Sequence, residues 1–457
     1  RLQSRLDAKN ADLGKKHNEA VRIRLEAQRD AIVEELLNAQ QRLSLFSREL
    51  NLAATPLPDN MPDLKEDALL QQALKSCRPV ILKSAARTDS YIAAAAEVLR
   101  QGKNVFIMVN EITLAGCLCE QLRDTFGQLL LVHHSQLTRS AQRRICDKVR
   151  SGQQYILIGT RSAIFVPHRD LGLIIVENEE STFYKQGDTA PRYNARDCAV
   201  KLSAIHKCRI ILGSVSPSLE TILNGRNGKY CMVDRKADAK EMRPECQEII
   251  VDIPAERAKN GVEGPFSKIL LKQISLLPES RRIALIRGFE RAEDLPPLPL
   301  TDTLTIQQAA HTDLSGYDLV AMLSADALFN ASDFRSDEHV FQYLERLRST
   351  CPRLVIQTSQ AAHQAFHLKS SETLLEERRA FKLPPYTRMV NVYTSRTAVL
   401  SQMLAAKGFS AWCGKDTVHI TLSRDKFMGD NKKEIRKTVE DFRICSKQDA
   451  VIDVDPA

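Results

Sequence analysis

Three short apolar segments, each followed at once by polar residues, decide the fold of this chain. They are residues 155–158 leading into Gly159-Thr160-Arg161-Ser162-Ala163, residues 173–176 leading into Glu177-Asn178-Glu179-Glu180, and residues 209–212 leading into Gly213-Ser214-Val215-Ser216-Pro217-Ser218. Short β-branched runs that are separated by helix-length segments predict buried parallel strands. Functional groups gather at the carboxyl ends of such strands. The sequence therefore predicts an α/β fold with polar clusters at one sheet edge, which is typical of a nucleotide-driven motor.

Composition sets broad limits on the function. The 457 residues are 43% hydrophobic and 27% charged, as in ordinary globular proteins of two or three domains. No apolar run could span a bilayer and no signal-peptide pattern is present, so we expect a cytoplasmic protein without a membrane partner. The net charge of +8 allows a polyanion partner without requiring one. The eleven cysteines form no Cys-x-x-Cys pair, which favours reduced thiols over metal ligands.

The motifs, taken in their order, resemble the primosomal protein N′ (PriA) family, the superfamily 2 helicases of bacterial replication restart. The resemblance begins near the first motor strand and continues, with gaps, to the C-terminus. Its further motifs are Tyr184-Lys185-Gln186, Arg192-Tyr193-Asn194-Ala195-Arg196-Asp197, Leu383-Pro384-Pro385-Tyr386-Thr387-Arg388 and Ile452-Asp453-Val454-Asp455-Pro456. It implies RecA-like helicase lobes with ATP and Mg²⁺ as cofactors. As partners it implies forked DNA or single-strand/duplex junctions, primosome proteins and the replicative helicase loader, in the bacterial cytoplasm at the nucleoid.

Four regions are expected along the chain. Residues 1–63 form an amphipathic helix and a linker, the remnant of an upstream DNA-binding region, and the absence of an initial Met suggests a fragment. Residues 64–230 form the first RecA-like lobe. Residues 231–370 form a reduced second lobe without the family's zinc-binding insert. Residues 371–457 form a small C-terminal α+β domain that, by resemblance, contacts DNA.

The phosphate loop departs from the working pattern. Such a loop reads Gly-x-x-x-x-Gly-Lys-Ser/Thr, and its glycines let backbone N–H groups surround the phosphates. The loop after the expected strand at 79–82 contains no glycine, and Ala86-Arg87 stands where the working pattern has Gly-Lys. A planar guanidinium does not replace a compact ammonium in a tight nest. Arg87 and Thr88 are therefore the candidate nucleotide-binding residues of a degenerate loop.

The acidic motif departs as well. The family has Asp-Glu-Glu-His, in which the Asp holds Mg²⁺ through water and the next Glu orients the attacking water. Here Glu177 replaces the Asp, Asn178 replaces that Glu, and Glu180 replaces the His. An amide cannot act as a general base. Glu177 and Glu179 are the candidate catalytic residues, and the alternative is a solvated acidic strand end.

The candidate DNA-binding residues interleave aromatic and basic side chains, which suits stacking on bases and pairing with phosphates. They are Arg161, Tyr184, Lys185, Arg192, Tyr193, Arg196 and Arg388. The alternative is a surface loop with ordinary packing aromatics. Ser214 and Ser216 resemble the family's hinge between the nucleotide and DNA sites. Basic residues from Arg424 to Lys437 offer a further DNA contact or, equally, a solvated helix face.

No metal site is predicted. The adjacent His133 and His134 lack further ligands at suitable spacing, and Cys231, Cys246 and Cys351 lie far apart in sequence, so no zinc is expected. The family's arginine-finger segment is replaced by a helix whose Arg346 and Arg348 are expected to be solvated charges. The alternative is that one of these two arginines reaches a phosphate.

Three functions remain open. The first is a DNA-binding protein of replication restart, which recognises forks and assembles the primosome with an inactive or impaired ATPase. The second is an active ATP-dependent 3′-to-5′ helicase with divergent motifs. The third is a structural scaffold that binds no DNA. Losing the phosphate cradle, the water-orienting carboxylate and the arginine finger together favours the first.

Overall fold

The computed structural model describes residues 57–58, 61–187, 189–235, 246–296, 298–312, 314–329, 334–424 and 428–456. Residues 57–135 and 154–457 belong to one compact unit, and residues 136–153 lie outside it. Those residues contain α6 (Arg139–Arg150), whose N-terminus is capped by Thr138, the acceptor of the Ala141 amide proton. The amphipathic helix expected in residues 1–50 lies outside the described residues.

The first lobe is built on a seven-stranded sheet in which every pairing is parallel. Its strands, from one edge to the other, are β3 (Leu130–His133), β4 (Ile156–Gly159), β2 (Asn104–Met108), β5 (Leu171–Glu177), β6 (Arg209–Ser214), β1 (Val80–Lys83) and β7 (Cys231–Asp234). Val, Ile and Leu fill both faces of the central strands, as expected for a parallel sheet covered by helices. The sheet extends past the predicted lobe boundary at residue 230, because β7 pairs with β1.

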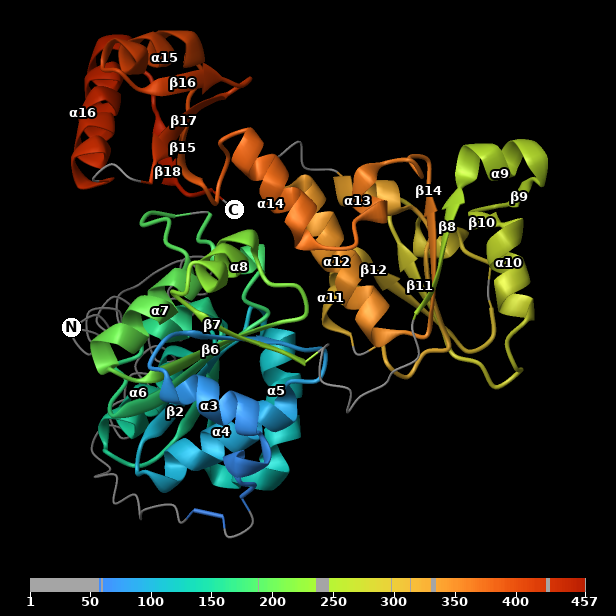
Figure 1. The fold of residues 1–457 in the computed structure, drawn as a ribbon, viewed down its shortest axis with the longest axis horizontal. Helices are drawn as coiled ribbons and strands as arrows, with labels where there is room; N and C mark the ends of the chain where they lie inside the picture. The colour runs from blue at the N-terminus through green and yellow to red at the C-terminus, as the bar shows by residue number, and fades with distance from the viewer. Residues whose placement is uncertain are drawn as a thin grey trace, which may run out of the picture. The chain divides into compact units, whose positions relative to one another are not determined.

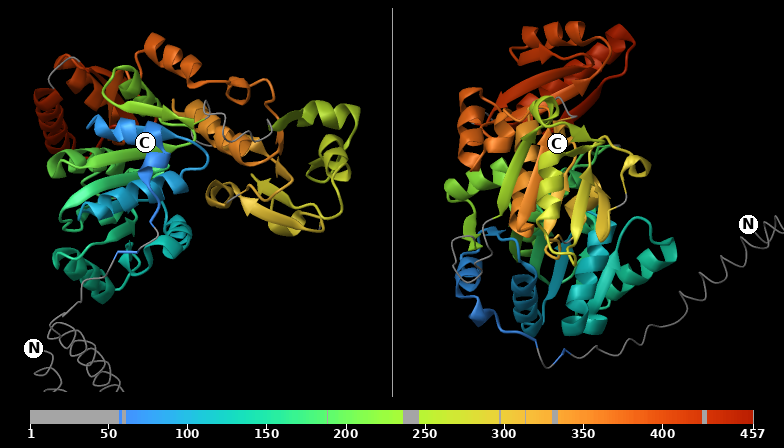
Figure 2. Two further views of the ribbon diagram at one scale, coloured as in Figure 1. Left: turned by 60° about the horizontal axis from the view of Figure 1, so that its bottom comes forward. Right: turned by 90° about the vertical axis from the view of Figure 1, so that its right-hand side faces the viewer.

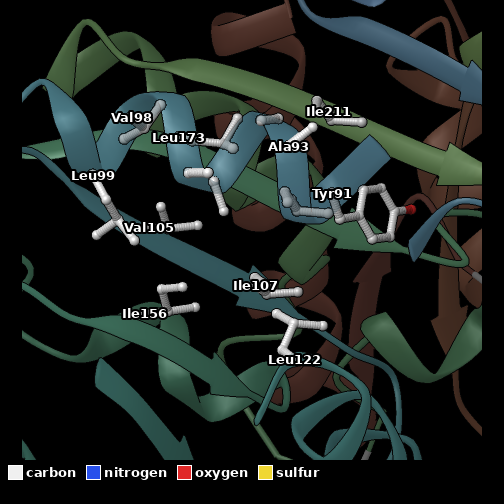
Figure 3. Close-up of a cluster of buried hydrophobic side chains, with 14 of the residues drawn as sticks. Tyr91, Ala93, Val98, Leu99, Val105, Ile107, Leu122, Ile156, Leu173 and Ile211 are labelled. Carbon is white, nitrogen blue, oxygen red and sulfur yellow. The ribbon is translucent and has the colours of Figure 1, made fainter. Parts of the chain in front are cut away.

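Helices cover both faces of this sheet (Figure 1). They are α3 (Ala68–Lys75), α4 (Thr88–Arg100) and α5 (Ile112–Phe126) on one face, and α7 (Ala195–His206) and α8 (Leu219–Arg226) on the other. In Figure 3, Val98 and Leu99 of α4 lie against Leu173 and Val105 of the sheet, in the main apolar core. The hydroxyl of Tyr91 points away from that core, so the ring belongs to the apolar cluster while its polar end reaches the strand ends.

The second lobe contains a five-stranded sheet, again with parallel pairing throughout. Its strands are β12 (Thr301–Thr305), β11 (Ile283–Arg287), β13 (Leu319–Met322), β14 (Arg353–Thr358) and β8 (Gln247–Asp252). The helices of this region are α9 (Ile253–Lys259), α10 (Lys268–Ser275), α11 (Ile306–His311), α12 (Ser336–Thr350), α13 (Gln364–His367) and α14 (Ser371–Ala380). A short hairpin of β9 (Val262–Glu263) and β10 (Phe266–Ser267) precedes α10. Apolar side chains of α8, α12 and α14 share one cluster, so α14 packs with the motor helices.

The C-terminal domain has the order strand, helix, strand, strand, helix, strand. Its elements are β15 (Thr387–Tyr393), α15 (Thr397–Ala406), β16 (Ser410–Cys413), β17 (Thr417–Ser423), α16 (Met428–Ser446) and β18 (Val451–Val454). The antiparallel sheet runs β16-β17-β15-β18, which is the ferredoxin-like split βαβ arrangement. Both helices contribute to one core against a single face of the sheet (Figure 2). The other face therefore has no helix of this domain on it.

The predicted α/β fold is confirmed, and the expected strands are present with bounds shifted by one or two residues. Helix α4 begins at Thr88, directly after the phosphate-loop position. The loop that the family uses for phosphates thus still leads into a helix N-terminus.

Candidate functional site

The predicted polar clusters meet at the carboxyl edge of the seven-stranded sheet. The strands β1, β6 and β5 are neighbours, with Lys83 opposite Ser214 and Gly213 opposite Glu177. Beyond the strand ends, the Ser84 amide donates to the Ser214 carbonyl at 3.0 Å. The parallel register therefore places the loop after β1 beside the acidic motif after β5.

Arg87 fills the space between these two loops. Its Nε donates to Glu177 Oε2 at 3.1 Å and its Nη2 donates to Asn178 Oδ1 at 3.0 Å. Nη2 also forms an ion pair with Glu177 Oε1, and Nη1 donates to the Ser84 carbonyl. The Tyr91 hydroxyl donates to the same Glu177 carboxylate. Only 7% of Arg87 is exposed, so its planar fork is held on all sides by acceptors of this chain.

The electrostatics agree with this geometry. Burial alone would raise the pKa of Glu177, but the Arg87 charge and its hydrogen bonds hold that pKa below the ordinary value. Burial would likewise lower the pKa of Arg87, yet the charge of Glu177 raises it. Burial and the neighbouring Glu177 charge raise the pKa of the Tyr91 hydroxyl well above its ordinary range. Arg87 and Glu177 are therefore both ionised and neutralise each other.

These residues do not fit a Mg²⁺-bound triphosphate. The Arg87 guanidinium and the Glu177 carboxylate, which stand where a phosphate-binding lysine and a magnesium ligand are needed, are bonded to each other. Thr88, the residue that retains the family's hydroxyl, donates instead to Gln121 Oε1 at 3.2 Å. Gly213 of β6, the strand between β1 and β5, is packed against the Tyr91 hydroxyl and Glu177. The space beside this glycine is therefore filled as well.

Glu179 is buried and organises the start of α8. It accepts hydrogen bonds from the Ser218 amide at 2.7 Å, the Ser218 hydroxyl at 3.1 Å and the Thr221 hydroxyl at 2.9 Å. Arg196, at the start of α7, pairs with it at 3.2 Å. Two predicted site residues, one catalytic and one DNA-binding, are thus joined in one network that fixes both helix starts. Sequence reasoning missed Ser218, although its place as a helix N-cap was readable.

Glu180 differs from Glu177 and Glu179 because, among the described residues, no arginine or lysine forms an ion pair with its carboxyl group. Burial raises its pKa to about 7, the Glu179 charge adds to this, and a hydrogen bond from Ser214 opposes it. Its Oε2 is buried and has no hydrogen-bond partner among the described residues. The hydroxyl of Ser214 also accepts a bond from the Ser216 amide at 2.9 Å, so the two predicted coupling serines lie beside this carboxyl group.

One arginine of the second lobe faces the same site. Burial lowers the pKa of Arg346 in α12, while the charges of Glu180 and Glu177 oppose that effect and Arg87 adds to it. Arg348 instead forms an ion pair with Glu248 at 2.7 Å and is only 15% exposed. The expectation that both are solvated helix charges is therefore wrong, because Arg346 is half-buried near the acidic motif and Arg348 is paired.

The predicted DNA-binding loop is mostly bonded internally. Tyr184 is buried, and its hydroxyl donates to the carbonyls of Met108 at 3.1 Å and Glu177 at 2.5 Å. Lys185 is buried and pairs with Asp453 of β18 at 2.8 Å. Arg161 donates to the Lys185 carbonyl at 2.7 Å. Their assignment to DNA stays a prediction, but the structure places these polar groups within the protein's own contacts.

Arg388 and Arg192 show the same tendency at the C-terminal domain. Arg388 pairs with Asp455 through both arms of its guanidinium. Arg192 lies 4.0 Å from Asp453 and above the ring of Tyr393 at 6.0 Å. The Arg388–Asp455 pair therefore lies within the C-terminal domain, and Arg192 connects the region around the predicted loop with the C-terminal strands.

Sequence reasoning missed the aromatic residues that are exposed. Phe165 is 67% exposed and meets the ring of Tyr193 edge-on at 5.1 Å between centroids. Phe183 is also exposed, whereas the adjacent Tyr184 is buried, because the turn η4 (Thr182–Tyr184) directs neighbouring residues to different sides. The exposed surface that combines these rings with Arg161 and Arg192 is named the aromatic–basic patch below.

Ion pairs also join α8 to α12. The Leu219 amide donates to Glu338 at 3.1 Å, and Arg335 pairs with Glu220 at 2.7 Å. Beside them lies a cleft of about 280 Å³, lined by charged side chains of both signs, among them Glu180, Arg196, Arg335 and Arg388. These pairs are a second set of contacts that sequence patterns did not reveal, since charges far apart in the chain carry no periodic signal.

Within the described ranges, no three His, Cys, Asp or Glu side chains gather in a way that could hold a metal ion. The prediction that zinc is absent remains a prediction. None of the helices in the described part of the chain combines the length and the hydrophobicity that a bilayer span requires.

Comparison with known proteins gives consistent relatives. No family model matches the chain. It is 35% identical over 189 residues to replication restart protein PriA of Chlamydia pneumoniae, a match that covers 41% of this chain and 25% of the relative. It is 33% identical over 233 residues to the PriA of Rickettsia prowazekii (strain Madrid E), covering 50% of this chain and 35% of the relative. The chain thus spans about a quarter to a third of the curated relatives it matches, and the predicted resemblance to PriA is confirmed.

Solved structures show weaker likeness. RecG bound to a three-way DNA junction gives a TM-score of 0.40 at 14% identity, covering 72% of this chain and 46% of that chain. The helicase MrfA bound to DNA gives a TM-score of 0.44 at 10% identity, covering 83% of this chain and 65% of that chain. Similarities at this level are too weak to support an inference about function.

Proposed function

We propose that this PriA-like chain is a DNA-binding protein of replication restart whose ATPase site is closed by its own side chains. In this proposal it recognises forked DNA in the bacterial cytoplasm, at the nucleoid, and serves as a platform for primosome proteins and the replicative helicase loader. The observation that carries the proposal is the buried network of Arg87, Glu177 and Asn178. It occupies the position where the family binds and hydrolyses ATP.

The network argues against hydrolysis for two separate reasons. A bound nucleotide would have to separate a buried, bidentate ion pair. This separation costs about 3–5 kcal/mol before any phosphate contact forms. In addition, the residue at the water-orienting position is Asn178, whose amide is already an acceptor for Arg87 and cannot take up a proton. The two losses are independent, so repairing one leaves the other.

The aromatic–basic patch supports the DNA-binding part of the proposal. Exposed rings offer faces on which unpaired bases can stack, and guanidinium groups beside them pair with phosphates. Phe165, Phe183 and Tyr193 supply the rings, and Arg161 and Arg192 supply the positive charge. The net charge of +8 acts in the same direction.

The test is ATP hydrolysis and nucleotide binding, measured beside a titration of forked DNA at several salt concentrations. The PriA of Bacillus subtilis, which is 31% identical over 189 residues, is the positive control. We expect no DNA-stimulated turnover and no nucleotide binding, together with salt-sensitive fork binding. Arg87→Lys should not restore turnover, because Asn178 remains. Clear ATP turnover by the unmodified chain would refute the proposal that its own side chains close the ATPase site. Absence of fork binding would favour the third function, a structural scaffold that binds no DNA.

Arg346 favours a second candidate function, an active helicase with divergent motifs. Its guanidinium faces the acidic motif from α12, as a catalytic arginine must face a nucleotide held between two lobes. If the chain hydrolyses ATP, Arg346→Ala should reduce turnover by several orders of magnitude, whereas Arg348→Ala, which breaks the Glu248 pair, should affect stability only. Equal effects of both variants would remove this support.

A further inference from the structure

The C-terminal sheet has one face without a helix of its own domain. The register places Trp412 opposite His419, His419 opposite Asn391, and Asn391 opposite Asp453, in one row across the four strands. The alternate residues Val390, Val392, Val418 and Ile420 form the core against α15 and α16. Because side chains alternate between the faces of a strand, the row from Trp412 to Asp453 lies on the face opposite the helices.

This face carries exposed aromatic rings. Trp412 is 42% exposed, and its ring is stacked on that of His419 with 5.4 Å between centroids and an interplanar angle of 23°. His419 is fixed in turn by a hydrogen bond of 2.9 Å between its Nδ1 and Asn391 Oδ1. Tyr393, two residues beyond Asn391 on the same face, is 38% exposed. The Trp412 ring is therefore supported on one side by His419, and both Trp412 and Tyr393 remain partly exposed.

The face is continuous with the aromatic–basic patch of the first lobe. Arg192 lies above the ring of Tyr393 at 6.0 Å, and Tyr193, the next residue, contacts Phe165. Lys185, from the same segment, neutralises Asp453 at the end of the row. Arg192 thus lies between two aromatic pairs, Phe165 with Tyr193 in the first lobe and Tyr393 with Trp412 on the C-terminal sheet.

We propose that the exposed part of this sheet face, around Trp412 and Tyr393, binds single-stranded DNA as a continuation of the aromatic–basic patch, with Trp412 and Tyr393 stacking on bases and Arg192 contacting a phosphate, whereas Asn391 and Asp453 of the same row are buried. The proposal rests on the DNA-binding function proposed above and names the site and the form of its ligand. Unpaired bases are required, because the bases of a duplex are stacked on one another and do not present their faces to a flat protein surface.

The basic residues of α16 are a weaker candidate for the same ligand. Arg436 pairs with Glu440 at 3.0 Å, and Lys433 pairs with Asp430 at 3.8 Å, both within the helix. Within α16 itself the aromatic residue is Phe442, and its ring is buried in the core rather than exposed beside these charges. Positive charge without stacking surface suits duplex phosphates or solvent more than unpaired bases.

Trp412 itself can report the binding, because it is the sole tryptophan of the 457-residue chain. The experiment titrates the full chain with oligo-dT under selective tryptophan excitation. Stacking of a thymine on the indole should quench its fluorescence saturably, with a midpoint that matches the affinity from anisotropy of labelled oligo-dT. A duplex of the same length should quench far less.

Variants then separate stacking from charge. Trp412→Ala should weaken oligo-dT binding about 5- to 150-fold, whereas Trp412→Phe, which keeps a ring, should stay within a few-fold of the unmodified chain. Arg192→Gln should lower the slope of log affinity against log salt by about one. The control Phe381→Ala removes a ring that is 71% exposed outside this face and should change nothing. Lys432→Ala with Lys437→Ala in α16 should leave oligo-dT binding nearly unchanged.

The outcomes distinguish this proposal from the one on which it rests. If the unmodified chain binds no DNA of any form, the DNA-binding function itself fails. If it binds forks and oligo-dT but Trp412 fluorescence does not change and Trp412→Ala binds normally, the function stands and the sheet face is overturned. If the α16 variant loses single-strand binding and Trp412→Ala does not, the site lies on α16.

Discussion

The buried pair of Arg87 and Glu177 sets what a single substitution can do at this site. Arg87→Ala leaves the Glu177 carboxylate buried without its cation, so we expect a loss of about 3–5 kcal/mol in the free energy of unfolding. Urea unfolding of the purified variant measures the loss. The matched control is Arg123→Ala, which breaks the exposed pair with Glu120 and should cost about 0–1 kcal/mol.

A double-mutant cycle sharpens that prediction. Adding Glu177→Gln to Arg87→Ala removes the stranded charge, so the double variant should be more stable than the sum of the two single losses predicts. Simple additivity would show that the two side chains do not form the pair described.

Glu180 gives the protein a pH dependence of its own. Its pKa of about 7 in the folded chain lies above the ordinary value of 4.5. Below about pH 4.5 both the folded and unfolded chains carry the proton, and between about pH 4.5 and 7 the unfolded chain alone releases it. The contribution of Glu180 to the unfolding free energy therefore falls as the pH rises through this window, and stays low above it.

The Glu180→Gln variant tests this sign. It lacks the ionising group, so it should be more stable than the unmodified chain by about 3 kcal/mol near pH 8, with the difference shrinking toward pH 5. Chemical denaturation at a series of pH values provides the measurement. The control is Glu440→Gln, the same substitution at an exposed position. A pH-independent difference for Glu180→Gln would contradict the raised pKa of Glu180.

At the scale of the element, the short turn η4 places two adjacent aromatic residues in different environments, with Phe183 exposed and Tyr184 buried. Phe183→Ala should weaken binding to single-stranded DNA about 5-fold or more, with little change in stability, because its ring is exposed. Tyr184→Phe should cost about 1–3 kcal/mol in stability, because two buried carbonyls lose their donor, while DNA affinity stays unchanged. Anisotropy titrations measure the DNA affinity of the two variants, and thermal unfolding measures their stability. If Phe183→Ala lost stability and Tyr184→Phe lost DNA affinity, the assignment of Phe183 to the surface and Tyr184 to the core would be wrong.

At the scale of the whole molecule, Lys185 joins the chain's middle to its end. Its ammonium group is buried with Asp453 and also donates to the Val454 carbonyl at 2.6 Å. Lys185→Met should strand the Asp453 carboxylate and speed tryptic cleavage after the exposed Lys382, which precedes the C-terminal domain. Lys407→Met, which breaks an exposed pair with Glu434, is the control and should leave the cleavage rate unchanged. Equal rates for both variants would mean that the buried pair does not hold the domain.

The buried strands and the α/β fold could be predicted from the sequence, whereas the side-chain contacts at the site could not. Apolar runs such as Leu173–Val176 were readable as buried strands, because strand burial depends on local residue type. The parallel register then brought Glu177 near Arg87, as a shared sheet edge requires. The pairing of the two was not readable, since nothing local shows that an arginine bonds the neighbouring motif rather than a ligand. For the same reason, Tyr184 and Lys185 resembled free DNA-binding groups, although their partners lie at Met108 and Asp453.

The closed site also constrains how such a protein can change over generations. Arg87, Glu177 and Asn178 satisfy one another, so replacing any one of them alone by the residue of a working motor leaves buried groups without partners. We therefore expect any single substitution of this kind to lower the free energy of unfolding without restoring catalysis. If the site is closed as proposed, a return to a nucleotide-binding site therefore requires several coordinated substitutions rather than one.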